Sequence, residues 1–225
     1  MLVSNWMTKD VITINVDESM HKAVSLMKRN NIRLLPVVKK GALVGIVTDR
    51  DLKRASASDA TSLDINELLY LISTIKIKNI MSKRVISIPD DFTVEETAEI
   101  LLSNKISGAP VVDSAGALVG VITQTDIFKV LISLTGVGKK GVQFAFQIED
   151  RPGSIKDLAD IIRKYQGRML SILSSYDRVP EGHRNVYIRI QSLAPEKLQP
   201  LKTELRQISK LLYVIDHREG KREIY

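Results

Sequence analysis

Two short segments of the sequence each place a hydroxyl three residues before a carboxylate. Thr48 is followed by Asp51, and Thr123 by Asp126. Each pair comes directly after an apolar run and opens a helical pattern, which puts the threonine at the helix N-cap. Such a pair can form a capping box, in which each side chain satisfies a backbone N–H of the other residue. It can also bind a ligand, because a helix start attracts phosphate and a carboxylate there can accept hydrogen bonds from ribose hydroxyls.

An internal repeat positions these pairs. Three blocks recur in the same order and at nearly the same offset: 7–14 as 81–88, 32–38 as 106–112 and 45–51 as 120–126. Each copy has the pattern of a β-α-β-β-α unit. A unit of about 60 residues buries its sheet poorly alone, so we expect the two copies to pack together about a pseudo-twofold axis. Between them, residues 55–58 are predicted to form a loop and residues 61–69 a short helix.

The repeated blocks resemble the CBS domain, which is named after cystathionine β-synthase. The resemblance rests on Val-Ile-Thr-Ile at 11–14, Ile-Arg-Leu-Leu-Pro-Val-Val at 32–38 and Gly-Ile-Val-Thr-Asp-Arg-Asp at 45–51, each with its second copy. It covers about 7–55 and 81–133. Two CBS motifs in tandem resemble a Bateman module. This implies a regulatory sensor, not an enzyme, that binds an adenosine nucleotide (AMP, ADP or ATP) or S-adenosylmethionine, with or without Mg²⁺.

The resemblance also implies roles for individual residues. Asp51 and Asp126 would bind ribose, and Thr48 and Thr123 would bind phosphate. The backbone around ten residues would enclose adenine: Thr13, Ile14, Leu35, Pro36 and Val37 in the first motif, and Ser87, Ile88, Ala109, Pro110 and Val111 in the second. Arg33 would reach phosphate, although an arginine at a helix end also fits a plain surface position. Its counterpart is Ser107, so we expect the two clefts to differ in affinity.

The C-terminal part has the pattern of a different domain. After a glycine-rich linker at 136–141, the order of elements is β-α-β-β-α-β, a ferredoxin-like pattern. The expected elements are strands at 142–148, 169–176, 185–192 and 211–217 and helices at 155–166 and 195–208, with Gly167 as the C-cap of the first helix. The sequence thus predicts an α/β (α+β) chain, a CBS-domain pair followed by a ferredoxin-like domain, with motifs at 1–70 and 71–136 and the last domain at 141–225.

The turn after the first strand of this last domain makes it resemble an ACT domain. The turn residues are Asp150, Arg151, Pro152, Gly153 and Ser154. Many ACT domains bind an amino acid where this turn meets a dimer partner, so the turn is a candidate amino-acid site. The alternative is that it only joins a strand to a helix. The resemblance implies a homodimer, and the whole arrangement resembles bacterial CBS–ACT proteins of acetoin utilisation, with an unknown regulated partner.

Composition and charge limit the classes of function and partner. The net charge of +7 divides into +1 over residues 1–138 and +6 over residues 139–225, so a nucleic-acid-linked or transcriptional regulator is the alternative function. Nucleic acid is not the favoured partner, because no basic run with stacking aromatics is found. His21, His183 and His217 lie in no catalytic motif. With no cysteine, no signal peptide and no long apolar run, we expect a cytoplasmic protein without membrane contact or a metal site.

Overall fold

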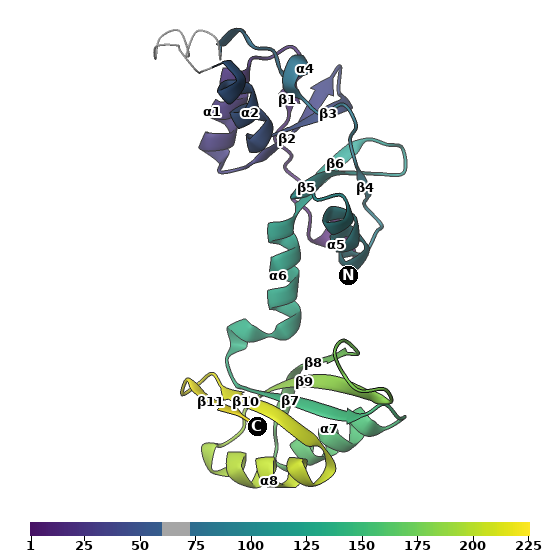
Figure 1. Cartoon of the computed structure of the whole chain (residues 1–225), viewed down its shortest axis with the longest axis vertical. Helices are drawn as coiled ribbons and strands as arrows, with labels where there is room; N and C mark the ends of the chain where they lie inside the picture. Colours follow the sequence, from purple (N-terminus) through teal and green to yellow (C-terminus); the bar gives the residue numbers. More distant parts are fainter. Residues whose placement is uncertain (60–72) are drawn as a thin grey trace. The chain divides into compact units, whose positions relative to one another are not determined.

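The computed structural model describes residues 1–59 and 73–225, so the predicted helix at 61–69 lies outside the described residues. The chain divides into two compact units, Met1–Phe128 and Lys129–Tyr225 (Figure 1). The first unit contains both repeats, and the second contains the predicted ferredoxin-like domain.

The first repeat folds as predicted. Its elements are η1 (Val3–Asn5), β1 (Ile14–Asn15), α1 (Met20–Asn30), β2 (Leu34–Lys39), β3 (Ala42–Thr48), α2 (Asp49–Asp59) and α4 (Ile77–Ile80). Strand β2 lies in the middle of a three-stranded sheet, parallel to β1 and antiparallel to β3. Helix α1 begins where the Ser19 hydroxyl accepts a hydrogen bond from the Lys22 amide. Met20, Ala23 and Met27 bury one face of this helix against the sheet.

The second repeat has the same β-α-β-β-α elements in the same order, and α4 before it corresponds to η1 before the first repeat. The elements of the second repeat are β4 (Ile88–Pro89), α5 (Val94–Ser103), β5 (Gly108–Val112), β6 (Leu118–Thr123) and α6 (Gln124–Thr135). The central strand again carries a register shift at the same place, between Val37 and Val38 in the first repeat and between Val111 and Val112 in the second. The prediction of a duplicated β-α-β-β-α unit is therefore confirmed.

Each repeat is completed by the segment that leads into the other. Thr8 pairs with Val121 of the second repeat, and Ser82 pairs with Ile46 of the first, by two backbone hydrogen bonds in each case. A methyl group at Gly45 would collide with the side chain of Met81. Glycine lets the segment at Met81 and Ser82 approach β3 closely, and a larger residue would force Met81 to move. The exchange places residues of one repeat beside the helix start of the other.

The second unit is a five-stranded antiparallel sheet with its two α-helices on one face (Figure 1). Its elements are η2 (Val137–Lys139), β7 (Val142–Glu149), α7 (Ser154–Lys164), β8 (Arg168–Ser175), β9 (His183–Gln191), η3 (Pro195–Lys197), α8 (Leu198–Ile208), β10 (Lys210–Asp216) and β11 (Lys221–Ile224). The strand order is β11-β10-β7-β9-β8. Phe144, Phe146, Leu158, Ile162 and Ile188 are fully buried between sheet and helices. The predicted β-α-β-β-α-β order is present.

Two local predictions were wrong, and one strand was missed. The predicted loop at 55–58 belongs to α2, which runs on to Asp59 because alanine and serine tolerate a helix here. The left-handed residue after α7 is Gln166, with φ of 65°, and not Gly167. Strand β11 was not predicted at all. It is a short, charged edge strand, which has little of the period-two hydrophobic pattern that marks a strand.

Within residues 1–59 and 73–225, no helix combines the length and the hydropathy that a membrane crossing requires.

Candidate functional site

A cleft of about 250 Å³, which we name the Asp51 cleft, lies between the two repeats of the first unit. The first repeat contributes the end of β3 and the first turn of α2. The second contributes its lead-in segment and the segment between α5 and β5. The lining residues are Ile46, Thr48, Asp49, Arg50, Asp51 and Arg54 from the first repeat and Ser82, Arg84, Ile86, Lys105, Ile106, Ser107 and Gly108 from the second. The cleft exists because the repeats exchange their lead-in segments.

The predicted capping box is present at the start of α2. Asp51 Oδ2 accepts hydrogen bonds from Thr48 N at 2.9 Å and from Thr48 Oγ1 at 2.7 Å. Its other oxygen, Oδ1, accepts from Arg54 Nη2 at 2.6 Å. The Asp51 side chain is 11% exposed, whereas that of Arg54 is 76% exposed. An exposed i,i+3 ion pair contributes little free energy, so ribose hydroxyls could replace Arg54 at Oδ1 without breaking the cap.

The backbone amides at the start of α2 are largely occupied. Thr48 N donates to Asp51, Asp49 N donates to the Arg33 carbonyl at 3.0 Å, and Asp51 N lies 3.4 Å from Thr48 Oγ1. These N–H groups are therefore poorly placed to cradle a phosphate. The Thr48 hydroxyl also directs its proton to Asp51. Any anion in this cleft would depend mainly on cationic side chains such as Arg84 and Lys105.

The second Thr-x-x-Asp turn repeats the geometry at the start of α6. Asp126 Oδ2 accepts from Thr123 N at 3.0 Å and from Thr123 Oγ1 at 2.7 Å. Asp126 is 5% exposed. Neither residue lines the Asp51 cleft, so the two turns belong to separate places in the first unit.

The ten residues whose backbone is expected to enclose adenine lie mostly in the two sheets of the first unit. Eight of the ten expected residues are buried in the two central sheets: Ile14, Leu35, Pro36, Val37, Ile88, Ala109, Pro110 and Val111. Thr13 and Ser87, the other two, do not line the Asp51 cleft either. The isoleucines that line the cleft are Ile46, Ile86 and Ile106. Because β2 and β5 are central strands with buried side chains, these strands could contact adenine only through their backbone, and that contact stays a prediction.

The contact predicted between Arg33 and a phosphate stays a prediction. Arg33 is exposed and does not line the Asp51 cleft, where its counterpart Ser107 is found instead. The lead-in exchange explains this, because the helix start of the first repeat faces the second repeat. Sequence reasoning identified Lys105 as a possible source of positive potential, together with Lys53 and Arg54, but missed Arg84. The signal that could have found Arg84 was the basic residue that ends the repeated Met-Ser-Lys-Arg block at 81–84.

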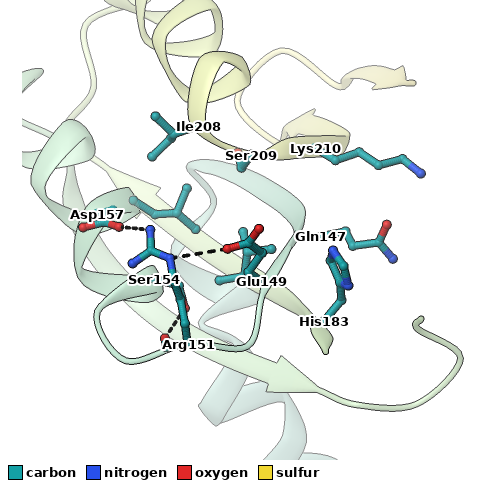
Figure 2. Close-up of a pocket in the computed structure, with 11 residues that line it drawn as sticks. Gln147, Glu149, Arg151, Ser154, Asp157, His183, Ile208, Ser209 and Lys210 are labelled. Carbon is teal, nitrogen blue, oxygen red and sulfur yellow. Dashed lines mark hydrogen bonds and ion pairs between the residues drawn. The ribbon is translucent and has the colours of Figure 1, made fainter. Parts of the chain in front are cut away.

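A second cavity, of about 330 Å³, lies in the second unit at the turn between β7 and α7 (Figure 2). Acidic, basic and uncharged side chains line it together. The lining residues are Gln147, Ile148, Glu149, Arg151, Ser154, Asp157, Leu158, His183, Ile208, Ser209 and Lys210. Arg151 pairs with Asp157 at 2.7 Å and with Glu149 at 3.6 Å, as the dashed lines in Figure 2 show. Of the five predicted turn residues, Arg151 and Ser154 line this cavity.

The remaining interactions of the turn are internal. Ser154 is 5% exposed, donates to the Arg151 carbonyl at 2.9 Å and accepts from Arg184 Nη2 at 3.0 Å. Asp150 pairs with Arg184 at 3.5 Å, and Gly153 has φ of 89° as the N-cap of α7. These contacts are enough to hold a strand-to-helix connection. The turn thus fits the plain structural interpretation and also borders a cavity.

Part of the positive charge of the second unit is taken up by ion pairs. Eight of its cations pair with a carboxylate: Arg151, Lys156, Arg163, Lys164, Arg184, Lys202, Arg218 and Lys221. A ninth, Arg189, is 3% exposed. Nucleic-acid interfaces need unpaired cations gathered on one face, and this distribution does not favour one.

Within the described residues, no three acidic, histidine or cysteine side chains come together as a metal site. A Mg²⁺ ion in the Asp51 cleft would therefore have to be held mainly by a ligand's phosphates.

Known proteins resemble the first unit of the chain. A family model described as the CBS domain matches residues 3–58 and 77–133. A CBS domain-containing protein of Dictyostelium discoideum is 34% identical over 135 residues, which cover 60% of this chain and 93% of that protein. The inosine-5′-monophosphate dehydrogenase of Methanocaldococcus jannaschii is 35% identical over 122 residues, which cover 54% of this chain but 22% of the enzyme. The chain thus spans about a fifth of that enzyme's length.

Two solved structures are also similar. The CBS domain pair of protein MJ0100, in complex with 5′-methylthioadenosine and S-adenosyl-L-methionine, is 31% identical with a TM-score of 0.50 and covers 58% of this chain and 99% of that chain. A Vibrio cholerae protein assigned to acetoin utilization (AcuB) is 27% identical with a TM-score of 0.51 and covers 62% of this chain and 96% of that chain. Because the family model matches both repeats and half of the residues, the chain belongs to the CBS domain family.

Proposed function

We propose that this protein is a regulatory sensor that binds an adenosine ligand in the Asp51 cleft. The proposal rests on the observation that the two oxygens of the Asp51 carboxylate have different partners. One oxygen closes the helix cap, and the other contacts Arg54, whose side chain is 76% exposed. Ribose hydroxyls would bind that second oxygen, and adenine would lie against Ile86 and Ile106. The MJ0100 domain pair, solved with two adenosine compounds, supports this ligand class.

Regulation follows from where the ligand would sit. The cleft has one wall from each repeat, so a ligand there contacts both and favours the arrangement of repeats that binds it better. A partner protein or the second unit would respond to that change. We place no reaction in this chain, because neither cavity holds a nucleophile with a positioned base. In the Asp51 cleft, both carboxylates are already engaged by Thr48, Lys53 and Arg54.

Calorimetric titration with AMP, ADP, ATP, S-adenosylmethionine and 5′-methylthioadenosine tests the proposal. Wild-type protein should bind at least one of them at micromolar concentration, and Asp51→Asn should weaken that binding at least about tenfold, because asparagine keeps the cap but loses the ribose-binding charge. Asp126→Asn is the matched control, since it makes the same change at the other cap. Lack of heat with every ligand, in folded and ligand-free protein, would refute the proposal. So would equal effects of the two variants.

For the second unit we propose an ACT domain that supports a homodimer and binds an amino acid. The strand order and the position of the turn support the assignment, and strands β8 and β11 are the sheet edges available for pairing. A zwitterion suits the second cavity, where carboxylates and cations lie together. Light scattering should give twice the 25.2 kDa chain mass, and a monomer at micromolar concentration would exclude the dimer. A screen of the twenty amino acids by thermal shift tests the ligand.

The physiological setting is proposed from the Vibrio cholerae relative assigned to acetoin utilization. A strain without this gene should grow more slowly on acetoin but normally on glucose, and equal growth on both would set this role aside. A transcriptional or nucleic-acid role is the second candidate, but the ion-paired cations of the second unit speak against it. Retention on heparin that falls steeply with salt would favour it.

A further inference from the structure

The Asp51 cleft carries an excess of positive charge. Its lining includes four cations and two carboxylates: Arg50, Arg54, Arg84 and Lys105, with Asp49 and Asp51. Both carboxylates are already paired, Asp49 with Lys53 at 3.4 Å and Asp51 with Arg54 at 2.6 Å. Among the described residues, no carboxylate within ion-pair distance neutralises Arg50, Arg84 or Lys105. Three exposed cations therefore line the cleft with no acidic partner in the part of the chain that the structure describes.

The repeat itself shows that two of these cations are not needed for folding. Arg84 and Lys105 correspond to Asp10 and Asn31 in the first repeat, at the same offset as the flanking blocks. The first repeat forms the same elements without either positive charge. The charges at these two positions thus serve something other than the fold.

Lys105 also has a conformation that a lysine rarely adopts. Its φ is 54°, and that of its counterpart Asn31 is 52°. Asparagine tolerates this left-handed region better than lysine, because its short polar side chain can bond locally. The chain therefore carries a strained lysine at the cleft where asparagine would fit with less strain. Lys40 and Lys140 share this left-handed conformation, so the strain supports a role for Lys105 only together with its place at the cleft.

We propose that the Asp51 cleft selects adenosine polyphosphates, and that Arg84 and Lys105 are the residues that set this preference. The inference rests on the proposed function and names its ligand class. ATP or ADP brings several negative charges, which the unpaired cations of the second repeat can bind by charge-assisted hydrogen bonds. 5′-Methylthioadenosine is uncharged, and S-adenosylmethionine has a single carboxylate beside a sulfonium and an ammonium group, so both gain less from these cations than a polyphosphate does. Counterpart positions in the first repeat carry Asp10 and Asn31, and the preference is accordingly a property of this cleft alone.

The test exchanges each residue for the one that the other repeat carries. Arg84→Asp, Lys105→Asn and the double variant are titrated with ATP, ADP, AMP, 5′-methylthioadenosine and S-adenosylmethionine. Mg²⁺ is left out, because it would neutralise the phosphates. The parent is the wild-type protein, since Asp126 does not line the Asp51 cleft. Lys83→Asp is the matched control: it makes a comparable charge change on an exposed neighbour that does not line the cleft.

The parent should bind ATP at least about tenfold more tightly than 5′-methylthioadenosine. The double variant should lose at least about tenfold in ATP affinity and keep its affinity for 5′-methylthioadenosine within about twofold. Added salt should weaken ATP binding in the parent much more than in the double variant. Thermal unfolding checks folding, and Lys105→Asn should not lower the midpoint, because it relieves strain.

Two results would overturn the inference. One is an equal loss of ATP and 5′-methylthioadenosine affinity in the double variant, which would mean general damage to the cleft. The other is a parent protein that prefers S-adenosylmethionine or 5′-methylthioadenosine over ATP. If such a ligand binds and depends on Asp51, only the polyphosphate preference fails. If no adenosine compound binds the wild-type protein, the proposed function fails with it.

Discussion

The carboxylate of Asp51 holds Thr48 through a single oxygen. Oδ2 accepts from both N and Oγ1 of Thr48, at 2.9 and 2.7 Å, while Oδ1 lies 2.6 Å from Arg54 Nη2. Capping and ligand binding are therefore compatible uses of this turn, because each engages a different oxygen. A substitution can separate them, since a loss of stability reports the cap and a loss of binding reports Oδ1.

Removing the Thr48 hydroxyl should weaken the cap. Thr48→Ala deletes one of the two groups that Oδ2 accepts from, and we expect the free energy of unfolding of the first unit to fall by about 1 kcal/mol. Trp6, the single tryptophan of the chain, lies in this unit, so its fluorescence during urea unfolding reports the change. Thr125→Ala is the control. Thr125 is exposed in the first turn of α6, and the cost there should stay within about 0.5 kcal/mol. Equal costs would contradict the role of the hydroxyl.

Gly141, which directly precedes β7, should tolerate substitution less well than Gly182. It has φ of 89°, and a methyl group there would collide with the backbone carbonyl of Ile190. We expect Gly141→Ala to destabilise the second unit by roughly 3 kcal/mol or more, because the backbone at Ile190 or at Gly141 itself would have to move. Gly182→Ala is the control, since φ is 72° there but nothing lies within 4 Å of the added methyl group. Its cost should be about 1–2 kcal/mol.

Hydrogen exchange of the β7 and β9 amides measures both glycine variants within the second unit. Protection should fall much further in Gly141→Ala than in Gly182→Ala. Equal losses of protection would show that the left-handed backbone alone, and not the contact with Ile190, sets the requirement for glycine.

The sequence was sufficient for the repeat and for the order of elements. Duplicated blocks such as 45–51 and 120–126 are recognised by identity, and the apolar alternation along β7 marks a half-buried strand without any tertiary information. The Thr-x-x-Asp turns were also correctly placed at helix starts. These features depend on local spacing, which a single sequence displays directly.

The walls of the site could not be predicted in the same way. Ser107 and Arg84 border the Asp51 cleft because lead-in segments are exchanged between the repeats. Arg33, which belongs to the same repeat as Asp51, does not. The spacing of residues within one repeat does not show that the two repeats exchange their lead-in segments. Strand β11 was missed for a related reason, since Lys221–Ile224 pairs at the sheet edge through its backbone while its side chains remain mostly exposed.

The stability of the second unit should depend on pH through His217. Burial lowers the pKa of this imidazole, and the nearby Arg189 and Arg222 lower it further, against the opposing effect of Asp216. The Nε2 atom is buried with no hydrogen-bond partner among the described residues, so the fold favours the neutral ring. A folded-state pKa below the unfolded value of about 6.5 means that the unfolded chain binds more protons in this window. The stabilising contribution is therefore full above about pH 6.5 and is lost as the pH falls toward the lowered value.

Calorimetric unfolding from about pH 5 to about pH 7.5 measures this dependence, with His217→Gln as the comparison. The wild-type unfolding temperature of the second unit should rise with pH up to about 6.5 and then level off, while the variant should lack this component. The acidic groups with lowered pKa, such as Asp216, whose pKa falls mainly through its hydrogen bond with Arg218, titrate at more acidic pH and should affect both proteins alike. Parallel curves for the two proteins would show that His217 is solvated in solution and that its burial beside Arg189 does not govern this transition.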